Sequence, residues 1–166
     1  PIILAQPYTE CAHSGIYVTS DSQSAVIILD DSYTSTFKKG NSPTLFERSK
    51  KFAKETLTQL NPSSEVLLLR TTQQLSGEEK FTSPKDALKT LNNINQKWQP
   101  SYVNGIIKNS FNTLKKSKFA EKVIYIFSPL LKEPSLKVPK EIQTVQPETY
   151  RGIKNTAISN IKTTQG

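Results

Sequence analysis

The stretch Asp30-Asp31-Ser32-Tyr33-Thr34 places one carboxylate and two hydroxyls at alternate positions. Hard divalent cations such as Mg²⁺ and Mn²⁺ take oxygen ligands of these kinds in an octahedral array. Three ligands from one loop would leave the other positions to distant loops, water or a partner's carboxylate. The same residue types are common in ordinary turns, because Asp and Ser side chains cap backbone amides. Taken alone, the pattern favours a capped turn over a cation site.

Enzyme chemistry has little support elsewhere in the chain. Cys11 and His13 form the only thiol–imidazole pair, and two neighbouring ligands cannot complete a four-ligand zinc site. No Ser-centred nucleophile elbow, phosphate loop or dinucleotide fingerprint occurs. We therefore predict a protein that is not an enzyme. A Cys11-dependent enzyme is the alternative, and thiol alkylation would test it.

Three continuous apolar runs predict strands that are covered on both faces: Ala25–Leu29, Val66–Leu69 and Val123–Phe127. Asp30 follows the first run directly. Ligands of open parallel sheets bind beyond the carboxyl ends of the strands, so Asp30 falls on the edge where binding is expected.

Helical patterns separate these runs. Ser42-Pro43 predicts an N-cap followed by proline at the first helical position of a helix that Asn61-Pro62 ends. Ser83-Pro84 predicts the start of a second helix, and a third is expected from about Asn104 to Lys118. The element order predicts an α/β fold with an open, mostly parallel sheet and helices on both faces.

The predicted organisation has three parts: a lead-in over 1–24 that includes an edge strand, one domain over 25–150, and a trailing strand within 151–166. A loop or short hairpin is expected over 73–82. Late strands are expected at Ile142–Val145 and Thr156–Ile161. The net charge is +8, but the basic residues are spread along the chain, so nucleic-acid binding is not expected.

A resemblance to a known family is carried by three stretches. Residues 26–34 look like the first strand and metal-ion-dependent adhesion motif of a von Willebrand factor A domain. Residues 44–53 resemble that fold's first long helix, and residues 61–69 resemble the entry into its next strand. The chain is similar above all to the A domains of bacterial Bat-type membrane proteins of the aerotolerance-regulator group.

The resemblance extends to both flanks. Leu4-Ala5-Gln6-Pro7 looks like the exit of the second membrane helix that precedes such domains, and Asn155–Ile158 looks like a strand that follows them. It implies a Rossmann-like fold, anchoring in a membrane through segments outside this sequence, and a bacterial envelope location outside the cytoplasm.

The chain departs from the family's metal-binding pattern in two loops. The second loop, Gln99–Ile106, has no Thr and offers Ser101 or Asn104 instead. In the third loop, Phe127-Ser128-Pro129, proline stands where the family has Asp. The metal site of Asp30, Ser32 and Thr34 is thus predicted to be degenerate, with no cofactor and only weak Mg²⁺ or Mn²⁺ binding.

We therefore predict a non-enzymatic protein–protein interaction module whose partner is a protein. The expected partner-binding edge comprises Asp31, Tyr33, Ser101, Tyr102, Asn104 and Ser128. The alternative is a basic α/β domain that binds nucleic acid or anionic lipid. Salt separates the two predictions, because electrostatic binding weakens steeply as salt is raised.

Overall fold

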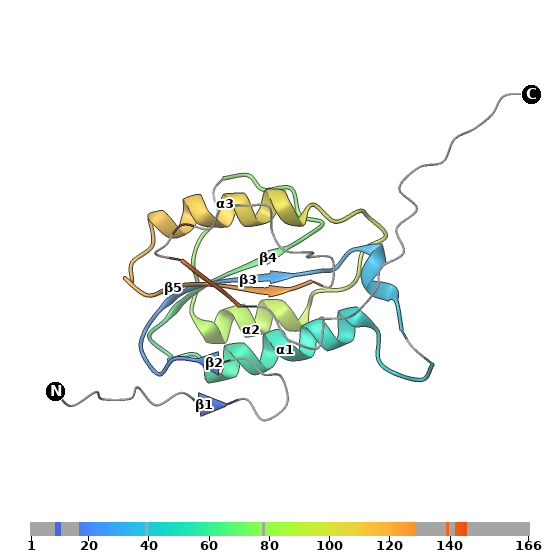
Figure 1. Cartoon of the computed structure of the whole chain (residues 1–166), viewed down its shortest axis with the longest axis horizontal. Helices are drawn as coiled ribbons and strands as arrows, with labels where there is room; N and C mark the ends of the chain where they lie inside the picture. Colours follow the sequence, from blue (N-terminus) through green and yellow to red (C-terminus); the bar gives the residue numbers. More distant parts are fainter. Residues whose placement is uncertain are drawn as a thin grey trace, which may run out of the picture.

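The centre of the molecule is an open sheet of four parallel strands (Figure 1). The computed structural model describes residues 9–10, 17–38, 40–77, 79–128, 139 and 142–145. The strands are β3 (Ser24–Leu29), β4 (Glu65–Arg70), β5 (Lys122–Phe127) and β6 (Gln143–Val145), in the spatial order β4-β3-β5-β6. All six residues of β3 are buried, as the continuous apolar run predicts.

The three long strands pair residue for residue. Leu29 at the end of β3 lies beside both Arg70 of β4 and Phe127 of β5. The strands therefore end at the same level, and the residue that follows each one lies at a common carboxyl edge of the sheet.

Helices cover both faces of the sheet. Helices α1 (Leu45–Gln59) and α2 (Pro84–Asn92) lie below it and α3 (Val103–Lys115) lies above it in Figure 1. Alternate side chains of β3 accordingly enter two separate cores: Ile27 packs on the side of α1 and α2, whereas Ile28 packs on the side of α3. These layers confirm the predicted α/β, Rossmann-like fold class.

The start of α1 differs from the sequence prediction. Thr44, and not Ser42, is the N-cap, and its hydroxyl accepts from the backbone N–H of Glu47 at 3.1 Å. The Glu47 side chain in turn accepts from the Thr44 backbone N–H at 2.7 Å. This reciprocal capping box satisfies two amide groups at once, which Ser42 followed by Pro43 does not offer.

The other helix limits are close to expectation. Ser83 caps α2, and Pro84 is its first residue, as predicted. Helix α3 ends at Lys115 rather than Lys118, and Lys116 is its C-cap. Between β4 and α2 the chain forms an irregular loop, in which Thr82 makes one antiparallel bridge with Val66.

The flanking regions are described only in part. Strand β1 (Thr9–Glu10) pairs antiparallel with β2 (Tyr17–Val18). Strand β6 falls within the predicted 142–145 strand. The stretches at 4–7, 155–158 and 156–161 lie outside the described residues. Within the described ranges, no helix has the length and apolar character needed to span a lipid bilayer.

Candidate functional site

Asp30 lies fully buried at the carboxyl edge of the sheet. Its Oδ1 accepts hydrogen bonds from the backbone N–H of Ser32 at 3.1 Å, the Ser32 hydroxyl at 2.6 Å and the Thr71 hydroxyl at 2.9 Å. Its Oδ2 accepts from the Ser128 hydroxyl at 2.8 Å. Thr71 follows β4 and Ser128 follows β5, so the Asp30 carboxylate joins the ends of three strands.

The hydroxyl of Thr34 extends this network. Its Oγ1 lies 2.7 Å from Ser32 Oγ. Because the single proton of the Ser32 hydroxyl is donated to Asp30, Thr34 must be the donor in this contact. We call Asp30, Ser32, Thr34, Thr71 and Ser128 the acid–hydroxyl cluster.

The carboxylate of Asp30 accepts its hydrogen bonds from within the acid–hydroxyl cluster. Its Oδ1 accepts three of them and its Oδ2 accepts one. Asp30 is also the only carboxylate of the cluster, and no group of three or more His, Cys, Asp or Glu side chains occurs among the described residues. A cation here would have Asp30 as its one charged ligand among neutral hydroxyls, so the cluster fits such an ion poorly.

Asp31 is also fully buried and is held by the end of β4. Its Oδ1 accepts from the Thr72 backbone N–H at 3.1 Å, and its Oδ2 accepts from the Thr72 hydroxyl at 2.8 Å. The Arg70 guanidinium Nη1 lies 3.9 Å from Asp31 Oδ2. Asp31 therefore stabilises the junction of two loops.

The connection between α2 and α3 crosses this edge and is fixed by backbone groups. Lys97 N donates to Asp31 O at 2.7 Å, and Tyr33 N donates to Gln99 O at 3.1 Å. Tyr102 N donates to the carbonyl of Thr71 at 2.9 Å. The loop after β3, the loop after β4 and the α2–α3 connection thus form one continuous surface.

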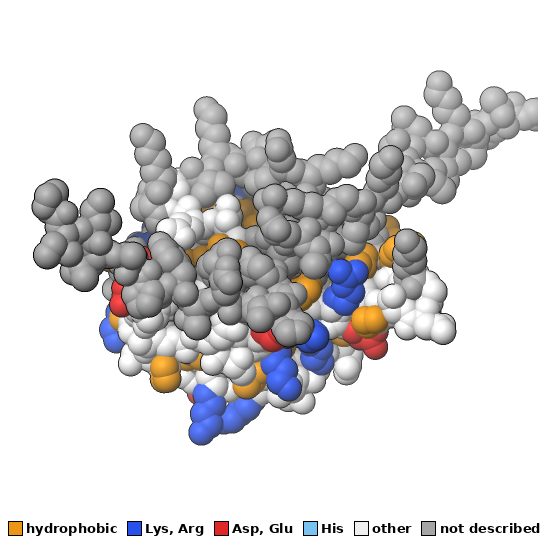
Figure 2. Space-filling view, turned by 60° about the horizontal axis from the view of Figure 1, so that its bottom comes forward, with side chains coloured by type: hydrophobic (Ala, Val, Ile, Leu, Met, Phe, Trp, Pro, Cys, Tyr) orange, Lys and Arg blue, Asp and Glu red, His pale blue; other side chains and the backbone are white. Residues whose placement is uncertain are grey.

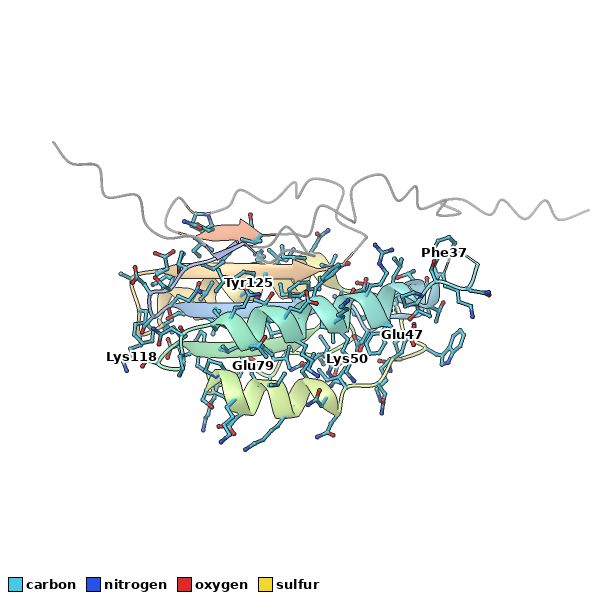
Figure 3. All side chains as sticks on the ribbon, turned by 90° about the horizontal axis from the view of Figure 1, so that it is seen from below. Phe37, Glu47, Lys50, Glu79, Lys118 and Tyr125 are labelled. Carbon is cyan, nitrogen blue, oxygen red and sulfur yellow. The ribbon has the colours of Figure 1, made fainter. Side chains whose placement is uncertain are left out.

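Exposed aromatic side chains gather on this surface. Tyr33 is 48% exposed, Phe37 58%, Trp98 86% and Tyr102 60%, and these are all the exposed large hydrophobic residues within the described residues. Tyr33, Trp98 and Tyr102 belong to the segments that the hydrogen bonds above hold together, and the carbonyl of Phe37 accepts from the first residue of α1. We call these four residues the aromatic rim; Phe37 is visible at one end of the molecule in Figure 3.

The other residues predicted from the sequence fall into four groups. Ser32, Thr34 and Ser128 contact Asp30 or one another, and Tyr33 and Tyr102 are exposed on the edge. Ser101 is half-buried, and its Oγ has no hydrogen-bond partner among the described residues. Asn104 is exposed in the first turn of α3. Neither side chain forms a hydrogen bond with the acid–hydroxyl cluster. Pro129, Cys11 and His13 lie outside the described residues.

Three residues of the edge were missed by the sequence prediction: Thr71, Phe37 and Trp98. Thr71 directly follows a predicted buried strand, so its position at the shared edge could have been expected from the parallel topology. The exposure of Phe37 and Trp98 has no comparable signal in the sequence, because an isolated aromatic residue is more often buried.

No family model matches the sequence, and no curated protein matches it either. The fold and the geometry of the carboxyl edge therefore carry the functional argument.

Proposed function

We propose that this chain is a non-enzymatic protein-interaction module, of the von Willebrand factor A type, that binds a protein partner through the aromatic rim. The observation that supports this proposal is the collection of four exposed aromatic residues at one edge of the sheet. Single exposed apolar residues are normal on a protein surface, whereas several on the loops of one edge indicate a contact surface. Tyr and Trp are also enriched among the residues that dominate binding energy.

The acid–hydroxyl cluster has a supporting role in this proposal. By joining the ends of β3, β4 and β5, it holds the loops that carry Tyr33 and Tyr102 in fixed positions. A preformed surface loses less conformational entropy when a partner binds. Asp30, Ser32 and Thr34 then act as loop-capping groups, and the site is a degenerate version of a metal-binding site.

Titration calorimetry with Mg²⁺ and Mn²⁺ tests this role. We expect no saturable binding at micromolar concentration. Saturable binding that both Asp30→Ala and Thr34→Val abolish would contradict the capping role. Thr34→Val is included because Thr34 is only half-buried and its loss disturbs the fold less than the loss of Asp30.

We further propose that the module is held at a bacterial envelope membrane by segments outside this sequence, with the domain outside the cytoplasm. This proposal rests on the resemblance of residues 4–7 to the exit of a membrane helix. The sequence upstream of Pro1 in the source genome tests it. Two hydrophobic spans there would support anchoring, and their absence would oppose it.

Capture experiments test the aromatic rim. The experiment compares which proteins of a membrane extract are retained by four immobilised chains. These are the parent chain and the variants Trp98→Ala, Tyr102→Ala and Lys118→Ala. Lys118 is exposed at the opposite end of the molecule from Phe37, so its variant is the control (Figure 3). We expect a protein that Lys118→Ala retains fully and that each rim variant retains about tenfold less, as loss of an interface anchor predicts.

Equal retention by all four proteins would overturn this proposal. Binding of DNA or anionic vesicles that disappears between low and physiological salt would favour the basic-domain alternative. On the face in Figure 2, Lys and Arg side chains lie among uncharged and acidic ones and do not form one continuous patch. This distribution gives the alternative no specific support.

A further inference from the structure

The outer edge of the sheet at β4 is largely unpaired. β4 pairs with β3 on one side. On its other side, the pairing within the described residues is limited to Val66 and Thr82, whose backbone groups exchange two hydrogen bonds of 2.8 Å. Among the described residues, none forms a backbone hydrogen bond with Leu68 on this side, and none is paired there with Arg70 as part of a strand.

The direction of the backbone groups identifies which residues face this open edge. The N–H groups of Glu65 and Thr71 donate toward the β3 side, whereas the N–H of Val66 donates away from it. Backbone groups along a strand alternate in direction with a period of two. The N–H and C=O groups of Leu68 and the N–H of Arg70 thus point outward, as those of Val66 do.

The chain that follows β4 leaves this edge open for a packing reason. The side chains of Leu75 and Phe81 pack into the core beneath α3. Residues 79–81 lie beside Asn109 and Asn112 of α3, where they line a shared hollow. The returning segment is therefore drawn toward the α3 face and reaches the plane of the sheet only at Thr82.

An open groove of about 580 Å³ lies along the same part of β4 on the other face. Leu68 and Arg70 form its strand side, and Thr90, Asn93 and Ile94 at the end of α2 form its helix side. Gln73 and Gln74, which follow β4, complete the lining. Leu68 also packs on the core shared with α1 and α2. We call this feature the β4 groove; it offers backbone donors and acceptors along one wall and side-chain contacts along the other.

The β4 groove carries positive charge. Among the described residues that line it, Arg70 alone is charged, and its side chain is 34% exposed. Lys50 lies at the helix side, where its Nζ donates to the carbonyls of Asn92 and Ile94 at 2.9 and 2.7 Å. Asp31 is the acidic group that contacts Arg70, at 3.9 Å, and it is fully buried. An incoming carboxylate would therefore meet an accessible guanidinium.

We infer that β4 is a docking edge for an extended, acidic peptide segment of a partner protein. The segment adds to the sheet as a further strand beside Leu68 and Arg70, with an acidic side chain next to Arg70 and alternate side chains in the β4 groove. Main-chain hydrogen bonds supply affinity in such strand addition, and pockets for alternate side chains supply specificity. No residue of the aromatic rim lines the β4 groove, and the inference does not rest on the proposed function.

Amide hydrogen exchange of the full chain tests the open edge. The amides of Leu68 and Arg70 should exchange about a hundredfold faster than those of Leu67 and Leu69, which point toward β3. The probe is a pool of end-blocked peptides of about six residues in which Glu alternates with Val, Ile or Thr. Adding the pool should slow exchange at Leu68 and Arg70. Slow exchange at both amides without peptide, or no change with it, would overturn the inference.

Fluorescence anisotropy with the same pool separates strand addition from charge attraction alone. N-methylation of alternate peptide amides should weaken binding about tenfold, because backbone hydrogen bonds are lost. Arg70→Gln and Asn93→Glu should each weaken it about tenfold, since one removes the positive charge and the other adds a negative charge to the groove wall. Asn112→Glu on α3 is the matched control and should bind unchanged.

Equal binding of the N-methylated pool, or equal weakening by Asn93→Glu and Asn112→Glu, would contradict strand addition. Trp98→Ala should leave binding of the pool unchanged. Failure of this inference is thus distinguishable from failure of the proposed function, which depends on Trp98.

Discussion

The two ends of the sheet both contain a carboxylate surrounded by donors. At the carboxyl end, Asp30 accepts from Ser32, Thr71 and Ser128. At the amino end, Glu65 Oε1 accepts from the Ser24 hydroxyl and from the backbone N–H of Lys118, both at 2.7 Å. Each network joins segments that are distant in the sequence.

The ends differ in burial and in what surrounds the network. Asp30 is fully buried, whereas Glu65 is half-buried. The exposed large hydrophobic residues of the described chain all lie in the carboxyl-end loops. Acid–donor networks therefore join distant segments at both ends of the sheet, and the aromatic rim is the feature that distinguishes the carboxyl end.

The largest effect is expected from Asp30→Ala, which removes the acceptor of four hydrogen bonds that join the ends of three strands. We expect the free energy of unfolding to fall by about 3 kcal/mol in urea denaturation, since a lost buried charged acceptor leaves several donors unsatisfied. Asp30→Asn keeps one acceptor oxygen and should therefore lower the free energy of unfolding by less. A loss below about 1 kcal/mol for Asp30→Ala would show that the cluster does not hold the three strands together.

Glu65→Ala should have a smaller effect at the other end of the sheet. We expect a loss of about 1–2 kcal/mol in the same measurement, because water can replace part of the acceptor at a half-buried position. Glu65→Gln, which retains an acceptor, is the control. If Glu65→Ala lowered the free energy of unfolding as much as Asp30→Ala does, the two networks would not differ in their contribution to stability.

The N-termini of α1 and α2 extend the comparison to pKa values. The Thr44 backbone N–H and hydroxyl donate to Glu47 at the start of α1 and lower the pKa of Glu47. At the start of α2, the ammonium group of Lys89 and the hydroxyl of Ser83 lower the pKa of Asp86. Salt screens the attraction between exposed charged groups more than it weakens hydrogen bonds from uncharged donors.

We therefore expect NMR titration to give both pKa values below the ordinary values of 4.5 for Glu47 and 3.8 for Asp86. High salt should raise the pKa of Asp86 more than that of Glu47. Because both values are lowered on folding, each group stabilises the fold above its unfolded pKa, and this contribution is lost as pH falls through the folded pKa. Equal salt sensitivity would contradict the assignment of Thr44 as the main cause for Glu47.

The smallest effect on stability is expected at the aromatic rim. Trp98 is 86% exposed, so Trp98→Ala should change the free energy of unfolding by less than about 0.5 kcal/mol. Thermal unfolding of the variant beside the parent chain measures this directly. A loss above about 1 kcal/mol would mean that Trp98 stabilises the α2–α3 connection and is not free to contact a partner.

Much of the fold could be predicted from local patterns. Continuous apolar runs identified β3, β4 and β5, because strands buried on both faces have no polar face. Ser83-Pro84 identified the start of α2 because cap and proline act locally. The start of α1 was misplaced because two cap residues competed, and the reciprocal bonds of Thr44 and Glu47 decided between them.

The candidate site was predictable only at its first loop. The sequence by itself determined that Asp30 follows a buried strand and that Ser32 and Thr34 are close enough to bond to it or to each other. Hydrogen bonds between residues two positions apart depend on local backbone geometry, which short patterns encode.

The tertiary structure alone decided what completes that loop. Thr71 and Ser128 reach Asp30 because β3 pairs in register with β4 and β5, whose residues are 41 and 98 positions away. The exposure of Trp98 likewise depends on where the α2–α3 connection crosses the edge. Strand register and loop placement are set by contacts between distant segments, and no short stretch of sequence contains both partners of such a contact.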